Sequence, residues 1–314
     1  MLAVAENVLP VFMLILIGWL AVRSGLLTAE IGDALGEFVF KLAVPVLLFK
    51  TIAEADFQGL SPFKLWVAYF AGVGVTWTVA HMIATRVFGR DERLGVVAGV
   101  SSAFANNVFI GLPLVGRTVG EDGIVALSIL LAIHLPVMMI AGTILMENAE
   151  AKASGNPPRG YRAVLRQIGI NLTRNPLVIG LVCGGVVHAS GLAMPAVASS
   201  IINQVANTAG PAALISLGMA LTKYGVSGNI GIASVMSGLK LLLLPAAVWT
   251  ASRLLGLTPE WTAAMVLTSS VPTGINAWLI ANRFGVGHGL AASTITMTTA
   301  LGVLSVTAWA VVLS

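Results

Sequence analysis

The chain has 314 residues, of which 57% are hydrophobic and only 10% are charged, and its net charge is +4. Soluble domains carry roughly 25% charged residues, so this composition excludes a soluble globular protein and predicts an all-α protein that crosses a membrane several times. The single cysteine, Cys183, excludes an internal disulfide.

Apolar runs of about 20 residues predict ten membrane spans. They cover residues 4–22, 35–53, 63–85, 94–117, 122–146, 175–191, 197–222, 232–255, 259–282 and 289–313. An even number of spans places both chain ends on one side of the membrane. Most basic residues fall in the loops of the other side, namely Arg23, Arg86, Arg90, Arg93, Lys152, Arg159, Arg162, Arg166, Arg174, Lys223 and Arg283. The positive-inside rule places these loops in the cytoplasm, below a plasma (bacterial inner) membrane, with both termini outside.

Span 4 contains an unusual stretch, Ser101 to Pro113, which holds two adjacent asparagines, a glycine and a proline in an uncharged apolar run. Pro113 removes a backbone donor and clashes with the preceding turn, so we expect the helix to break or kink here. Broken backbone at membrane depth is tolerated only where protein or a wet cavity satisfies it. Asn106 and Asn107 therefore indicate a binding site; the alternative is that they only cap the broken ends and hold helices together.

Titratable side chains are few within the predicted spans. His134, near the centre of span 5, is a candidate for proton coupling because imidazole exchanges protons near neutral pH; the alternative is a neutral histidine bonded to a neighbouring helix. Lys240 in span 8 and Lys41 in span 2 favour an anion, but we expect both to reach toward the membrane interface. No Asp or Glu falls in a membrane core, so we do not expect a carboxylate-based proton relay or cation site.

One long loop, residues 147–174, contains Asn156-Pro157-Pro158 and a basic stretch. We expect a solvated cytoplasmic connector whose basic residues meet anionic lipid head groups; the alternative is a partner-binding role. The loop divides the chain into two five-span halves, 1–146 and 175–314. Because five is odd, the second half enters the membrane inverted relative to the first.

The two halves repeat several landmarks in register. Pro10 and Pro176 lie early in the first span of each half, and Pro45 and Pro211 share the same offset. Span 9 has its own interrupted stretch, Val271-Pro272-Thr273-Gly274-Ile275-Asn276. Paired interrupted helices in inverted repeats are typical of secondary transporters.

If spans 4 and 9 cross near the midplane, their broken ends converge. Helix N-termini near Leu114 and Ile275 then offer free N–H groups and partial positive charge. The asparagine pair of span 4, Asn276 and the Thr273 hydroxyl add polar side chains. This neutral, donor-rich pocket suits a carboxylate or another small anion.

The sequence contains no enzyme signature such as Gly-x-Ser-x-Gly, His-Glu-x-x-His or a phosphate loop, so we expect no catalytic residues, no metal site and no cofactor. The spacings of Gly180 with Gly184 and of Gly32 with Gly36 predict close helix packing.

Several segments together resemble the auxin efflux carrier family, which includes plant auxin exporters and bacterial organic-acid carriers. They are Leu9-Pro10-Val11-Phe12, Gly18-Trp19-Leu20, Ala43-Val44-Pro45, Asn106 to Pro113, Asn175-Pro176-Leu177, Ser216-Leu217-Gly218-Met219 and Pro272-Thr273-Gly274. The resemblance covers essentially the whole chain, and its most specific part is the asparagine–glycine–proline segment. The short central loop is similar to that of the bacterial members.

The resemblance implies ten transmembrane helices in two inverted five-helix repeats, with helices 4 and 9 broken and crossing as in bile-acid–sodium symporters. It also implies a scaffold of spans 1, 2, 6 and 7, which can pair into a homodimer through helices 2 and 7. Spans 3–5 and 8–10 would form a transport domain that moves like an elevator. The residues expected to surround the substrate are Asn106, Asn107, Gly111, Pro113, Pro272, Thr273, Gly274 and Asn276.

The sequence therefore predicts a secondary transporter that moves small organic anions, malonate- or auxin-like mono- or dicarboxylates, by alternating access. A sodium-coupled symporter of the bile-acid type, a non-transporting membrane receptor and, more remotely, an intramembrane enzyme are the alternatives. Coupling to H⁺ or Na⁺ is left open. Membrane lipid is the other expected partner, and nucleic acid is not expected to bind.

Overall fold

A computed structural model describes residues 2–55, 61–155, 169–170, 172–191, 194–226 and 230–313. These residues are helical apart from the turns between helices and one isolated antiparallel bridge. Much of the predicted basic connector, including Asn156-Pro157-Pro158, Arg159, Arg162 and Arg166, lies outside the described residues.

The first half of the chain forms α1 (Leu2–Arg23), α2 (Ala29–Phe38), α3 (Val44–Glu54), α4 (Pro62–Met82), α5 (Glu92–Ala103), α6 (Leu112–Thr118) and α7 (Glu121–Ser154). The second half forms α9 (Pro176–Ser190), α10 (Ala196–Leu221), α11 (Ile230–Gly238), α12 (Leu244–Leu254), α13 (Pro259–Ser270), α14 (Asn276–Phe284) and α15 (His288–Leu313). Four π-helical turns adjoin these helices: η1 (Val39–Ala43), η2 (Ile83–Val87), η3 (Asn107–Gly111) and η4 (Leu239–Leu243). Helix α7 continues past residue 146, where we expected the connector to begin, because Glu147 and Glu150 end the apolar run without ending the helix.

Among the residues that the structure describes, five helical segments are long and apolar enough to cross a membrane, namely Glu6–Arg23, Pro62–Val87, Glu121–Ser154, Ile230–Leu254 and His288–Leu313. The chain is thus a multi-pass α-helical membrane protein. The other predicted spans fall short for identifiable reasons. Two of these spans are interrupted, one between α5 and α6 and the other between α13 and α14. Helix α9 is too short. The run from α2 to α3 carries charged residues, and α10 contains Ser, Asn, Gln and Thr. The arrangement in ten spans therefore stays a prediction.

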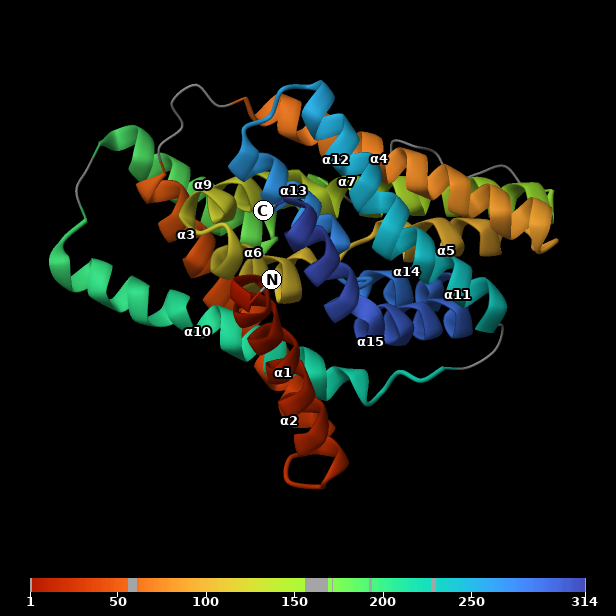
Figure 1. Cartoon of the computed structure of the whole chain (residues 1–314), viewed down its shortest axis with the longest axis horizontal. Coiled ribbons are helices and arrows are strands. Elements are labelled where there is room, and N and C mark those ends of the chain that lie inside the picture. Colours follow the sequence, from red (N-terminus) through yellow and green to blue (C-terminus); the bar gives the residue numbers. More distant parts are fainter. Residues whose placement is uncertain are drawn as a thin grey trace.

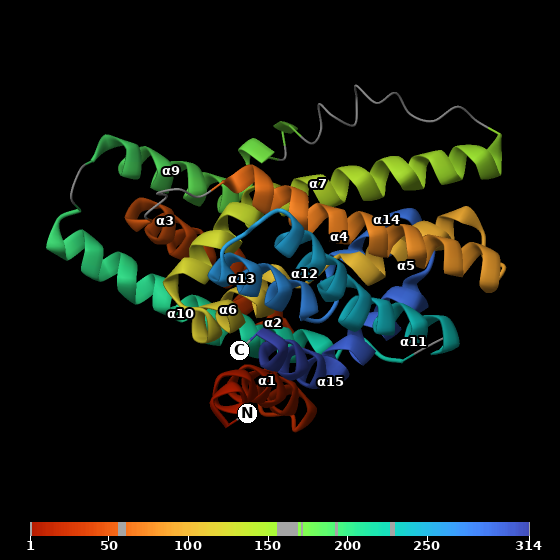
Figure 2. The same ribbon diagram turned by 45° about the horizontal axis from the view of Figure 1, so that its top comes forward.

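The helices gather in two groups (Figures 1 and 2). Helices α1, α2, α3, α9 and α10, with η1, pack on one another, and we call them the α10 group. Helices α4 to α7 and α11 to α15 form the α13 group, in which α4 packs against α5 and α12, and α13 packs against α7. The two groups meet where α1 contacts α6 and α15, and where α3 and α9 contact α7.

Glycines permit close helix contacts inside the α10 group. A β-carbon at Gly180 or Gly184 of α9 would collide with backbone atoms of α3, and a β-carbon at Gly32 would collide with the Met219 side chain of α10. A β-carbon at Gly36 would meet only ordinary contacts. The predicted close packing is therefore confirmed for the Gly180 and Gly184 pair and for Gly32.

Candidate functional site

The α5–α6 and α13–α14 helices are both interrupted, and the interruptions meet. Helix α5 ends at Ala103 and helical turns resume at Asn107, while α13 ends at Ser270 and α14 begins at Asn276. The two non-helical stretches run antiparallel and form the isolated bridge. Asn106 N donates to the Pro272 carbonyl at 3.0 Å, and a second backbone hydrogen bond, of 2.8 Å, joins the same two stretches.

That second bond runs from Gly274 N to the Phe104 carbonyl. Together the two bonds satisfy backbone groups that a broken helix leaves without partners, as apolar surroundings require. We call this arrangement the crossing. A β-carbon at Gly274 would lie 3.2 Å from the Ala105 carbonyl oxygen, so glycine allows the two segments to approach this closely.

The break lies farther from Pro113 than we predicted. Pro113 lies inside a continuous helical stretch, just after η3 passes into α6, and helical turns resume at Asn107 rather than near Leu114. The asparagine pair marks the break instead. Asn106 Oδ1 accepts from Phe109 N at 3.4 Å and thereby caps the new turn.

Asn107 is buried and bonded to two other helices. Its Nδ2 donates to the Tyr69 hydroxyl of α4 at 3.2 Å, and its Oδ1 accepts from Thr268 Oγ1 of α13 at 2.9 Å. A β-carbon at Gly111 would lie 2.5 Å from the same Thr268 oxygen, so glycine is needed where η3 meets α13. Asn107 therefore holds η3 between α4 and α13.

A cavity of about 310 Å³ opens beside the crossing. Its lining residues are Phe40, Phe104, Ala105, Asn106, Asn107, Val108, Phe109, Leu131, His134, Leu135, Leu177, Ile275, Asn276 and Leu279. Phe40 and Leu177 come from the α10 group, whereas the others come from the α13 group, so the cavity lies between the two groups. None of these lining residues is acidic, and the residues that the structure describes contain no cluster of His, Cys, Asp or Glu that could hold a metal ion.

The cavity brings together four of the predicted site residues: Asn106, Asn107, His134 and Asn276. Asn276 is half-buried at the first position of α14, and its side chain makes no hydrogen bond to any residue that the structure describes. The Asn106 Nδ2 group is likewise unbonded within the described part of the chain. These two amides are therefore available to a bound molecule.

The other predicted residues do not line the cavity. They are Gly111, Pro113, Pro272, Thr273 and Gly274. Thr273 Oγ1 donates to the Ser101 carbonyl at 2.7 Å, and Thr273 N donates to Thr298 Oγ1 at 3.0 Å. Thr273 thus fastens the crossing to α5 and α15.

His134 of α7 lies among aromatic rings at the edge of the cavity. Its ring centroid is 5.1 Å from that of Phe104, 5.5 Å from that of Tyr69 and 6.4 Å from that of Phe70. Its Nε2 atom is buried without a hydrogen-bond partner among the described residues. This nitrogen therefore does not make the bond to a neighbouring helix that we considered as the alternative, and proton coupling through His134 stays a prediction.

Lys240 contradicts the expectation that it reaches toward the membrane interface. Its side chain is completely buried, and Nζ donates to the carbonyls of Ser269 and Val271, each at 2.5 Å. These carbonyls lie at the C-terminal end of α13, where the break removes their helical donors. The signal in the sequence was that Lys240 is the only charged residue from 230 to 252. By contrast, Lys41 is exposed and pairs with Glu37.

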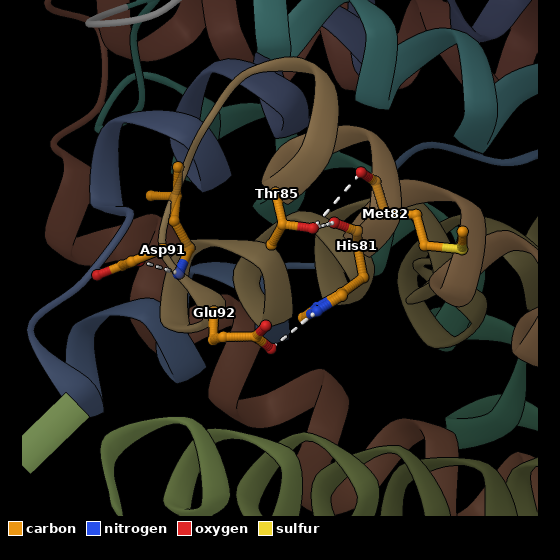
Figure 3. A network of polar contacts seen from close by, with 6 residues as sticks. His81, Met82, Thr85, Asp91 and Glu92 are labelled. Atoms are coloured by element: carbon orange, nitrogen blue, oxygen red, sulfur yellow. Dashed lines mark hydrogen bonds and ion pairs between the residues drawn. The ribbon is translucent and has the colours of Figure 1, made fainter. Parts of the chain in front are cut away.

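A separate polar cluster lies at the α4–α5 connection (Figure 3). His81 Nε2 lies 3.2 Å from Glu92 Oε2, and Asp91 caps α5 by accepting from Leu94 N at 2.8 Å. This bond from Leu94 N, aided by Arg93, lowers the pKa of the Asp91 carboxyl. None of these residues lines the cavity beside the crossing, and the His81–Glu92 contact joins α4 to α5.

Comparison with known proteins places the chain among membrane transporters. Residues 3–310 match the family described as membrane transport protein. A transporter of uncharacterised function from Methanothermobacter thermautotrophicus is 27% identical over 309 residues, which cover 98% of either chain. A proposed malonate transporter from Rhizobium meliloti is 26% identical over 96% of this chain and 92% of the relative. The Escherichia coli transporter YfdV is 23% identical over 89% of this chain and 88% of the relative.

Proposed function

The chain belongs to the membrane transport protein family, that of the auxin efflux carriers, and from this premise we propose that it is a secondary transporter of small organic anions. Mono- or dicarboxylates are the proposed substrates. The Rhizobium relative, proposed to carry malonate, covers nearly the whole chain and supports this class. Family membership also favours transport over catalysis as the activity.

The cavity beside the crossing is the observation that carries this proposal. Its available polar groups are the amides of Asn106 and Asn276, which can donate hydrogen bonds to a carboxylate. The N-terminus of α14 adds a partial positive charge at Asn276. A volume of about 310 Å³ leaves room for a small organic acid.

The position of the cavity between the two helix groups supports an elevator-like movement. We propose that the α10 group is the scaffold, which pairs with a second copy through the predicted spans 2 and 7, and that the α13 group carries the cavity across the membrane. In this proposal the chain has ten spans in two inverted halves, 1–146 and 175–314. The connector 147–174 is then cytoplasmic and both termini are outside.

The membrane potential determines the direction in which transport of an anion needs no coupling ion. For an anion leaving a cell with a negative interior, the potential favours export by about 2.3 kcal/mol per charge per 100 mV. Export therefore needs no coupling ion, whereas concentrative uptake needs one. Proton exchange at His134 is the candidate route for such coupling.

Replacing Asn276 with alanine tests the site. We expect Asn276→Ala to abolish malonate binding and malonate uptake into liposomes and to leave the melting temperature of the purified protein unchanged, because the side chain bonds to no described residue. Asn282→Ala is the matched control, since it makes the same change at an exposed position of the same helix. Isothermal titration and uptake of labelled malonate are the measurements, with indole-3-acetate and other carboxylates tested in parallel.

Each outcome separates the candidate functions. Wild-type affinity in Asn276→Ala would reject the site. Saturable binding by the wild-type protein without uptake would identify a receptor. Failure of every carboxylate to bind the wild-type protein would reject the anion class.

A further inference from the structure

The buried lysine at the crossing has no carboxylate partner within the described part of the chain. The ion pairs among the described residues join other side chains: Lys41 to Glu37, Lys50 to Glu54, His81 to Glu92, Arg93 to Asp91 and Lys223 to Asp33. The Lys240 ammonium meets two backbone oxygens instead, those of Ser269 and Val271. Carbonyl oxygens at the end of a broken membrane helix form the kind of site that holds a monovalent metal cation in secondary transporters.

The charge of Lys240 is only partly compensated by the helix that it caps. The C-terminal end of a helix such as α13 carries about half a negative elementary charge. About half of the positive charge of the Lys240 ammonium is therefore left uncompensated. A positive charge of this kind is costly in apolar surroundings and marks a functional position by default. A bound anion would complete the compensation.

This positive charge lies close to the cavity. Val271, which accepts from Lys240, precedes Pro272, and the Pro272 carbonyl accepts from the N–H of Asn106 in the cavity lining. An anion in the cavity therefore meets an attractive potential that the amides alone do not supply.

We propose that Lys240 is a tethered cation. Its ammonium fills a site that the carbonyls at the end of α13 form for a monovalent cation, so this site needs no sodium ion. The same ammonium supplies the positive charge that selects anions in the cavity. Selection of anions rests on the proposed function, whereas occupation of the cation site does not. The sodium-coupled alternative loses its most suitable ion site in consequence.

Chemical rescue tests the cation site without any substrate. We expect Lys240→Ala to lower the melting temperature of the purified protein in choline chloride, because the two carbonyls lose their donor. Methylammonium chloride or sodium chloride at the same concentration should restore most of the loss, because either cation is small enough to enter the vacated space. The wild-type melting temperature should be the same in all three salts.

Two results would overturn the cation site. One is a higher melting temperature of the wild-type protein in sodium chloride than in choline chloride at equal ionic strength. This comparison can be made even if Lys240→Ala does not fold. The other is a Lys240→Ala protein that neither methylammonium nor sodium restores. Lys41→Ala is the control, because Lys41 also lies in a π-helical turn before a proline but is exposed, and it should behave as the wild type.

A matched pair of variants tests the selection of anions. Lys240→Met keeps the length of the side chain and removes its charge, so we expect malonate affinity to fall by at least about tenfold. Lys240→Arg keeps the charge and should retain most of the affinity. Equal affinities in the wild type and Lys240→Met would overturn this part of the proposal. If the wild-type protein binds no carboxylate, the proposed function fails, and the salt experiment still decides the cation site.

Discussion

At the scale of single residues, the two adjacent asparagines at the α5–α6 break have separate roles. Asn106 caps η3 with its side-chain oxygen and keeps its amide nitrogen for the cavity. Asn107 also touches the cavity, but both ends of its amide are bonded, to Tyr69 and to Thr268. Loss of transport on replacing Asn107 would therefore combine lost ligand contact with lost support of the site.

We expect Asn107→Ala to destabilise the protein, unlike Asn276→Ala. The change leaves the buried hydroxyls of Tyr69 and Thr268 without their shared partner, and an orphaned buried polar group costs about 1–3 kcal/mol. Thermal unfolding in detergent measures the effect as a lower melting temperature.

The double variant Tyr69→Phe with Asn107→Ala is the control. Tyr69→Phe should lower the melting temperature of the wild type but should change little in the Asn107→Ala background, where it removes an already unpartnered hydroxyl. Additive effects of the two changes would show that the Asn107 bridge is not formed.

Residue types at the crossing were predictable, whereas their partners were not. Amides within an uncharged apolar run have few structural uses apart from a break or a binding site, so Asn106, Asn107 and Asn276 could be identified from the sequence. The bond from Thr268 to Asn107 spans 161 residues, and no local pattern indicates it. The inward direction of Lys240 depends on which face of its helix is buried, and hydropathy does not record that direction.

At the scale of helices, three prolines follow π-helical turns. Pro45, Pro113 and Pro245 each occupy the second position of the helix after η1, η3 and η4. Proline lacks an N–H group and its ring clashes with the carbonyl four residues earlier, so a wider turn relieves the crowding. Before Pro245 that carbonyl belongs to Leu241, and it accepts from the side chains of Ser305 and Trp309 on α15.

Proline therefore predicts that a helix is irregular but does not predict the form of the irregularity. Near Pro113 we expected the break itself, and the structure has a π-helical turn there and the break several residues earlier. Tertiary contacts decide between the two forms, because each freed backbone group needs a partner from another helix. Such partners come from distant parts of the sequence.

Glycine at position 111 sets the distance between η3 and α13. We expect Gly111→Ala to lower stability by about 1–3 kcal/mol, as other overpacked cores do, because the new methyl group would lie 2.5 Å from Thr268 Oγ1. It should also weaken substrate binding, since Asn107 and Asn106 belong to the displaced segment. Melting temperature and malonate titration measure the two effects.

Gly74→Ala is the control for this change. Gly74 lies on the exposed face of α4, and a β-carbon there meets no atom within 4 Å. Alanine stabilises helix interiors relative to glycine by about 0.5–1 kcal/mol, so this variant should be as stable as the wild type or more so. Equal behaviour of Gly111→Ala and Gly74→Ala would contradict the tight η3–α13 contact.

At the scale of the whole molecule, the two ends of the chain lie close together in both views (Figures 1 and 2). This placement agrees with the proposal that both termini face the same side. Helix α7 offers the best element for testing the orientation. It has 34 residues, so it is about 50 Å long and exceeds the thickness of a bilayer core.

Cysteine labelling at the two ends of α7 tests the proposed orientation. Because Cys183 is the only cysteine, Cys183→Ser provides a cysteine-free background. In intact cells, a membrane-impermeant maleimide should label Glu121→Cys, whereas it should label Lys152→Cys only after permeabilisation. Both positions are exposed, so access to the reagent depends on the side of the membrane alone. The reverse pattern would place the termini in the cytoplasm.

The crossing also has a consequence for biosynthesis. Side-chain bonds beside it join residues that lie 161 and 172 positions apart, from Thr268 to Asn107 and from Thr273 to Ser101. When the ribosome has made only the first half, the stretch from Phe104 to Asn106 has no strand partner, and its backbone groups are unsatisfied in the bilayer. The site is therefore completed only when α13 and α14 arrive, which makes assembly of the cavity a late step in folding, after the local helices of the first half have formed.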